Sequence, residues 1–135
     1  MGDGAAAAGR VMVLMDAERA WIRVSGRGTL AVGPPLREFI QQAEQSGVRE
    51  AILELADCDS MDSTFLGLIA GFAMRLRRAG GRMLAVSPGE RVQRLFRTLG
   101  LDRLLEIAPR PPAESAGGGE LLHSAPATGA RQVLL

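Results

Sequence analysis

Apolar and polar positions alternate along the middle of the chain with two different periods. Short apolar runs predict strands, and they cover residues 11–15, 21–25, 50–56 and 82–86, with a last short strand between 101 and 107. Apolar residues three and four apart predict helices, and this spacing covers residues 34–46, 62–79 and 88–99. The order β-β-α-β-α-β-α-β predicts one α/β domain with a small mixed sheet packed against helices, mostly parallel with an antiparallel edge.

Turn signals between these segments support the same order. Residues 16–19 predict a hairpin, while Gly47 and Gly80-Gly81 follow predicted helices. The run Ser87-Pro88-Gly89-Glu90 predicts a capping box, with the proline at the first position of the third helix. Together with the periodic pattern, these signals place the domain at residues 11–108.

The two ends of the chain differ in composition from the middle. Residues 1–10 are rich in Gly and Ala and predict a flexible N-terminus. Residues 109–135 are rich in Pro, Gly and Ala and predict a disordered tail, apart from short apolar pieces at Leu121-Leu122 and at 133–135.

Composition narrows the classes of function. The chain has 135 residues and a net charge of +1, which gives no electrostatic reason to expect a nucleic-acid or membrane partner. All 16 basic residues are arginine, so lysine chemistry is excluded. Cys58 is the only cysteine, the N-terminus does not resemble a signal peptide, and no apolar run approaches the roughly 20 residues that span a bilayer. We expect a cytoplasmic protein with no direct membrane insertion.

Three carboxylates follow the third predicted strand. Asp57, Asp59 and Asp62 lie in a short acidic loop before the second helix. A strand followed by Asp-x-Asp resembles the start of haloacid-dehalogenase-type phosphatases, in which the first Asp is the nucleophile and Mg²⁺ is bound. Such a site also needs a lysine and a further acidic motif, which this chain lacks. We interpret the three residues as turn-forming and helix-capping carboxylates, and we predict no catalytic residue, no metal site and no cofactor.

Two hydroxyl groups stand at the predicted start of the second helix. Ser63 and Thr64 directly follow Asp62. Either Asp62 or Ser63 acts only as the N-cap, or a hydroxyl here accepts a phosphate, whose negative charge a helix N-terminus tolerates. The residues alone leave both interpretations open.

The second helix has an unusual outer face. Its predicted core stripe consists of Phe65, Leu68, Ile69, Phe72 and Leu76. A surface helix normally carries charge opposite such a stripe, but here the other faces hold mainly Leu66, Gly67, Ala70, Gly71 and Met74. This pattern favours a flat apolar surface for a partner, and the alternative is that the tail packs over it.

Several segments at fixed distances resemble the STAS domain, the module shared by sulfate transporters and anti-sigma-factor antagonists. They are Ile52-Leu53-Glu54-Leu55, Met61-Asp62-Ser63-Thr64, Arg77-Arg78-Ala79-Gly80-Gly81-Arg82, and Leu99-Gly100-Leu101 with Leu104. The resemblance covers about residues 11–108, and the order of elements in that family matches the order predicted above.

The resemblance implies a site and a partner. In this family the segment from strand to Asp-Ser to helix is the phosphorylation and partner-binding site, so Ser63 is the implied phosphoacceptor. The implied function is that of an anti-sigma-factor antagonist, a regulatory protein and not an enzyme, which binds an anti-sigma factor with serine-kinase activity and is switched off by phosphorylation. Phe65 stands where the family usually has Gly. The partner-binding residues expected from the resemblance and the apolar face are Asp59, Asp62, Ser63, Thr64, Leu66, Gly67, Ala70, Gly71 and Met74.

One alternative within the same family uses the surface without the serine. STAS-like proteins also serve as non-catalytic adaptor subunits of membrane lipid-transport complexes. In that interpretation the partner is a transporter subunit, and phosphorylation of Ser63 is not needed.

Overall fold

The computed structural model describes residues 9–29, 33–109 and 131–134. Within these ranges the chain forms seven strands, three α-helices and one short 3-10 helix. The strands are β1 (Arg10–Met15), β2 (Arg19–Gly28), β3 (Glu50–Glu54), β4 (Cys58–Met61), β5 (Arg82–Val86), β6 (Glu106–Ala108) and β7 (Arg131–Leu134). The helices are α2 (Gly33–Gln45), α3 (Ser63–Arg78), α4 (Glu90–Leu99) and the 3-10 helix η2 (Leu101–Arg103).

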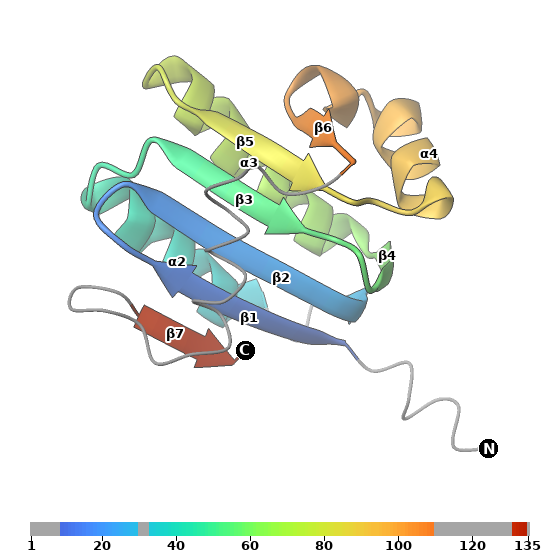
Figure 1. Cartoon of the computed structure of the whole chain (residues 1–135), viewed down its shortest axis with the longest axis horizontal. Coiled ribbons are helices and arrows are strands. Elements are labelled where there is room, and N and C mark those ends of the chain that lie inside the picture. The colour runs from blue at the N-terminus through green and yellow to red at the C-terminus, as the bar shows by residue number, and fades with distance from the viewer. Residues whose placement is uncertain (1–8, 30–32, 110–130, 135) are drawn as a thin grey trace.

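The strands form one mixed sheet in the order β6-β5-β3-β2-β1-β7, and β4 pairs with β2 outside this path. The pairs β2–β3, β3–β5 and β5–β6 are parallel, whereas β1 is antiparallel to both β2 and β7. Helices α2 and α3 lie on one side of the sheet (Figure 1). The predicted α/β architecture, mostly parallel with an antiparallel edge, is therefore confirmed.

The main core fills the space between the sheet and the helices. Alternate residues of each strand point toward this space, as the period of a strand requires. On α3 the buried residues are Phe65, Leu66, Ile69, Phe72, Ala73 and Leu76. The strands contribute Val11, Val13, Ala20, Ile22, Val24, Ala51, Leu53, Met83 and Ala85 to the same core.

The predicted turns have mixed outcomes. The hairpin between β1 and β2 is closed by the carboxylate of Asp16, which accepts hydrogen bonds from the N–H groups of Glu18 (2.8 Å) and Arg19 (2.9 Å). After α3, Gly80 has a φ of +85°, and a Cβ on Gly81 would lie 2.1 Å from the carbonyl oxygen of Arg49. Only glycine therefore fits at position 81, and the prediction that Gly80-Gly81 ends the second helix is confirmed.

The predicted capping box before α4 is wrong. Helix α4 begins at Glu90 after Gly89, with no side-chain cap. The Ser87 hydroxyl instead donates a hydrogen bond to the carbonyl of Pro109 at 2.9 Å, and Ser87 has a φ of +53°. The Ser87 hydroxyl, which the sequence pattern predicts as the cap of α4, therefore binds the backbone just after β6 instead.

Part of the predicted tail belongs to the sheet. Strand β7 pairs with β1 from Met12↔Leu134 to Met15↔Arg131 and so covers the outer edge of β1. A four-residue strand is too short for its period to be read from sequence. Residues 110–130 and 1–8 lie outside the described ranges, so the predicted disorder of the tail and of the N-terminus stays a prediction.

Candidate functional site

The segment between β3 and α3 is held by the end of β2. The predicted acidic loop contains strand β4, which runs parallel to β2 with Gly26 opposite Cys58 and Gly28 opposite Met61. The N–H of Gly26 donates to the carbonyl of Asp57, and the N–H of Asp62 donates to the carbonyl of Gly28, both at 2.8 Å. The expectation of a free loop is thus corrected, because β2 extends beyond β3 and offers backbone groups for pairing.

The start of α3 is fixed by one polar and one apolar contact. The Asp62 carboxylate accepts a hydrogen bond from the N–H of Phe65 at 2.9 Å, so Asp62 is the N-cap. The ring of Phe65 is fully buried, and a Cβ on Gly28 would lie 3.1–3.2 Å from three of its carbons. Phe65 therefore serves as a core residue that seats the first turn of α3 on the end of β2.

The two candidate hydroxyl groups are not part of these two contacts. Ser63 and Thr64 are the first two residues of α3, and both are exposed. Asp59, on β4, is also exposed. A modifying enzyme could reach Ser63 without unfolding the domain, and the cap that holds the helix start does not use its hydroxyl.

The predicted outer face of α3 is open at four of its five positions. Gly67 is exposed, with nothing within 4 Å of where a Cβ would stand, and Met74 is 40% exposed. Ala70 and Gly71 are half-buried. Leu66 differs, because it is only 6% exposed and belongs to the main core. The structure therefore places Leu66 inside and the other four residues on the surface.

This open face borders a groove between α3 and α2. The groove has a volume of about 260 Å³. Gly67, Leu68 and Gly71 line it from α3, whereas the α2 side is largely polar. Arg75 and Glu44 form an ion pair that joins the two helices beside the groove. The lining from α2 consists of Arg37, Ile40, Gln41 and Glu44.

A second groove flanks the site on the side of α4. It has a volume of about 320 Å³, and Asp59 and Ser60 of β4 line it together with Arg91 and Arg94. The remaining lining residues are Val92, Leu95 and Thr98. Sequence reasoning missed this helix as part of the site, because the contact between α4 and β4 joins segments that are distant in sequence. The exposed arginines three apart on α4 are the one signal that could have pointed to it.

Cys58, the first residue of β4, carries the one thiol at the site. Burial raises the pKa of the Cys58 thiol to about 11; a backbone hydrogen bond with Ser60 opposes this change and the carboxylate of Asp59 reinforces it. The thiol is therefore neutral and buried. The described ranges hold no group of three or more His, Cys, Asp or Glu residues that could bind a metal ion. Nor does any helix in them have the length and apolar character to cross a membrane.

Comparisons with known proteins agree with this fold. The family model described as "Mlab, STAS domain" matches residues 11–106. A Staphylococcus aureus anti-sigma-B factor antagonist is 29% identical over 86 residues, which are 64% of this chain and 80% of that protein. A Thermotoga neapolitana homolog of TM1081 is 38% identical over 61 residues, and the match spans 45% of this chain but only 54% of that relative.

Solved structures show the same architecture. The anti-sigma factor antagonist SpoIIAA in its unphosphorylated form matches with a TM-score of 0.67 and 23% identity, over 81% of this chain and 96% of that one. SpoIIAA from Bacillus in its phosphorylated form matches with a TM-score of 0.63 and 23% identity, over 82% and 98%. The fold is that of a small α/β module with a capped helix start beside an open helix face. The chain belongs to the STAS-domain family.

Proposed function

We propose that this protein is an anti-sigma-factor antagonist whose partner is an anti-sigma factor with serine-kinase activity. In this proposal the partner docks on the exposed residues around the start of α3 and phosphorylates Ser63, and the modified form no longer binds. The observation that carries the proposal is the position of Ser63, exposed at the first residue of α3 and beside the open face of that helix. The names of the relatives and the two solved forms of SpoIIAA support it.

The physical basis of the switch is the charge that a phosphate adds. A phosphoserine carries about 1.5 to 2 negative charges, and in the free protein the N-terminus of α3 offsets part of that charge. In the complex the phosphate would be taken out of water and held near the carboxylates of Asp59 and Asp62. A buried and poorly paired charge costs several kcal/mol. Because about 1.4 kcal/mol is a factor of ten in affinity, we expect binding to weaken by roughly two to three orders of magnitude.

We infer that the function rests on binding and not on catalysis. The carboxylate of Asp62 is used as the helix cap, and the thiol of Cys58 is buried and neutral. We infer a non-enzymatic regulator that works in the cytoplasm, and its net charge of +1 gives no electrostatic reason to expect nucleic acid or lipid as a direct ligand.

Intact mass after incubation with the cognate kinase and ATP tests the modification. We expect one added phosphate on the wild-type chain and on Thr64→Ala, and none on Ser63→Ala. Calorimetry with the partner then tests the switch. Ser63→Ala should bind at all times, whereas Ser63→Asp should bind poorly and still unfold at the temperature of the wild type. Phosphate only on Thr64 or Ser60 would refute the assignment of Ser63.

A second candidate function is a non-catalytic adaptor subunit of a membrane lipid-transport complex. It needs the face of α3 but not the serine, and Gly67, Ala70, Gly71 and Met74 of that face lie at the surface. Its signature is a partner that binds wild type, Ser63→Ala and Ser63→Asp with equal affinity and loses affinity only when the face of α3 is changed.

A further inference from the structure

The groove between α4 and β4 has an apolar floor and polar rims. Val92 is only 1% exposed and Leu95 is half-buried, so these two side chains form the floor. Asp59 and Ser60 form the rim on β4. The rim on α4 consists of exposed residues three and four apart, which share one side of a helix: Arg91, Arg94 and Thr98. The groove therefore combines an apolar contact with a basic rim on one side.

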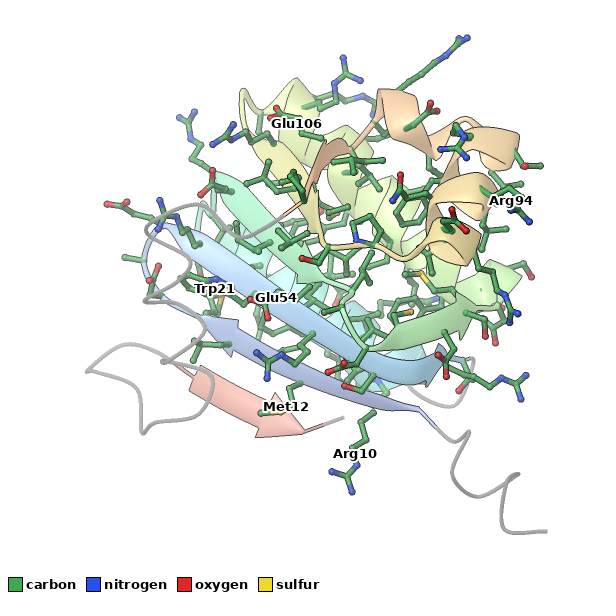
Figure 2. All side chains as sticks on the ribbon, turned by 45° about the vertical axis from the view of Figure 1, so that its right-hand side comes forward. Arg10, Met12, Trp21, Glu54, Arg94 and Glu106 are labelled. Atoms are coloured by element: carbon green, nitrogen blue, oxygen red, sulfur yellow. The ribbon has the colours of Figure 1, made fainter. Side chains whose placement is uncertain are left out.

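The two arginines of this rim have no acidic partner in the described part of the chain. Neither Arg91 nor Arg94 forms an ion pair or a hydrogen bond there, and Arg94 lies at the outer edge of the domain (Figure 2). Arginines of other elements do join neighbouring strands or helices through a glutamate, and these are Arg19, Arg23, Arg75 and Arg82. The rim arginines thus keep their guanidinium donors for an acceptor outside the domain.

The stability of α4 does not explain why both arginines are there. Helix termini favour carboxylates in the first turn and cations in the last turn. Glu90 in the first turn and Arg97 in the last turn follow this rule. Arg91 stands directly after Glu90, where a cation is unfavourable for the helix dipole. With three arginines and one carboxylate, α4 carries a charge of +2 in a chain whose net charge is +1. Binding of an acidic ligand gives this arrangement a purpose that folding does not.

The difference between the two rims indicates which kind of acidic ligand fits. A nucleic acid carries a negative charge at every phosphate, so a strand in the groove would bring phosphates toward the carboxylate of Asp59 as well. A peptide can place Asp or Glu on the arginine rim and apolar side chains on the floor. Helix α4 has 10 residues and a length of about 15 Å, which matches a helical segment of similar length.

We propose that this groove receives an acidic, amphipathic segment of the anti-sigma factor. Its carboxylates bind Arg91 and Arg94, and its apolar side chains pack on Val92 and Leu95. The inference rests on the proposed function for the identity of the protein that carries the segment. The chain from Asp59 to Ser63 extends over at most about 14 Å, so one partner can contact the start of α3 and the groove together. The groove then adds a second contact, selective for acidic partners, to the face of α3.

A synthetic peptide tests the groove without the partner. The probe is a helical peptide of about ten residues, the length of α4, with Glu on one side and Leu on the other, titrated into the isotope-labelled full chain. We expect chemical-shift changes at the amides of α4 and β4. Binding should weaken with added salt, because the Debye length falls from about 10 Å at 0.1 M to about 3 Å at 1 M. The same peptide with Gln in place of Glu, and a short single-stranded oligonucleotide, should both bind more weakly.

Arg94→Gln and Arg97→Gln form a matched pair of variants. Both remove one charge from an exposed position of α4, but only Arg94 lines the groove. Arg94→Gln should weaken binding of the peptide up to about fivefold, and Arg91→Gln/Arg94→Gln roughly tenfold or more. Arg97→Gln should stay within about twofold of the wild type. Asp59→Asn should strengthen binding of the peptide, because it removes the one carboxylate among the lining residues.

The same variants are then measured with the kinase that phosphorylates Ser63. We expect Arg91→Gln/Arg94→Gln to bind this kinase roughly tenfold more weakly than the wild type and Arg97→Gln to bind it almost as well. Thermal melts check that the variants fold. Should the double variant fail to fold, Thr98→Glu, which adds a negative charge to the rim, should weaken binding of both ligands, whereas Thr98→Gln should not.

Several results would overturn the proposal. Equal losses in Arg94→Gln and Arg97→Gln would reduce the effect to general charge, and tighter binding of the oligonucleotide would assign the groove to nucleic acid. A dimer in sedimentation that Arg94→Gln abolishes would assign it to a second copy of the chain. If the kinase phosphorylates Ser63 but binds the wild type and Arg91→Gln/Arg94→Gln equally well, the groove proposal fails and the proposed function stands. If no phosphate is added to Ser63, the proposed function fails, while selective binding of the acidic peptide would still support the class of ligand.

Discussion

Gly28→Ala directly perturbs the contact between Gly28 and the ring of Phe65, which holds the start of α3 next to Ser63. The added Cβ would lie 3.1–3.2 Å from three ring carbons of Phe65, a distance that requires the ring or the backbone to move. The ring is fully buried, so it has no open space to enter. Forcing one extra carbon into a packed core typically costs about 1–3 kcal/mol. For a domain of this size that cost should lower the melting temperature by roughly 5–15 °C.

The consequence should extend to the start of α3. The carbonyl of Gly28 accepts the N–H of Asp62 at 2.8 Å, and Asp62 in turn caps the helix through Phe65. A ring displaced by the new methyl group would therefore disturb the residues on both sides of Ser63. We expect Gly28→Ala to slow phosphorylation of Ser63 and to weaken partner binding, in addition to lowering stability.

A double-mutant cycle isolates the contact. Phe65→Leu alone removes ring volume and should destabilise the domain, but in its background Gly28→Ala should cost much less than in the wild type. Thermal melts and urea titrations of the four proteins measure the coupling. The matched control is Gly67→Ala, where a Cβ meets nothing within 4 Å. Additive effects of the two substitutions would refute the inference that Gly28 is small because Phe65 lies on it.

Three further predictions concern separate parts of the molecule. Gly67→Arg should abolish partner binding in calorimetry without lowering the melting temperature. Gly67→Ala should keep binding and gain up to about 1 kcal/mol of helix stability. A lower melting temperature of Gly67→Arg would mean that this face is internal. Glu54→Gln should lower the free energy of unfolding by about 1–3 kcal/mol, because the carboxylate is buried against Arg23. The control Glu106→Gln removes a carboxylate from an exposed ion pair with Arg82. It should change the free energy of unfolding by less than about 1 kcal/mol. Folding raises the pKa of Cys58 from 9.0 to about 11, so the thiol loses its proton at a lower pH in the unfolded chain than in the folded one. The free energy of unfolding should therefore fall as the pH rises from 9 to 11. Urea titrations across this range should show the fall in the wild type and not in Cys58→Ala.

The sequence periodicity predicted those parts of the fold whose structure is local. Strands and helices with several apolar residues in register were predicted within a few positions, because each buries its own apolar side. Strand β4 was missed, since its four residues pair with β2 only past a register shift at Gly26 and Arg27. The Ser87 capping box failed for a related reason: the hydroxyl bonds Pro109, 22 residues away. Both cases depend on contacts distant in sequence.

The candidate site shows the same limit. Asp62 as a possible cap and Ser63 at the first turn follow from spacing alone, and the structure has both at those positions. Leu66 was assigned to the outer face because it lies beside the stripe that begins at Phe65. The buried stripe of α3 is wider than one row, since Leu66 and Ala73 are buried as well. How much of a helix is covered depends on its neighbours in the fold, and a single sequence does not state which elements those are.

The two sides of the sheet carry different kinds of surface, and that difference bears on how such a small domain could act as a switch. On the helix side the surface is open: Gly67 and Met74 are exposed beside a groove, and nothing in the described residues fills it. On the helix-free side a second apolar cluster is buried, and it consists of Leu14, Trp21, Ile52, Leu84 and Val86. A partner that selects for exposed apolar area would therefore be directed to α3, where a single phosphate on Ser63 would lie at the edge of the contact. A domain with both sides open would bind a partner on either one, and modification at one helix start could then control only part of the binding.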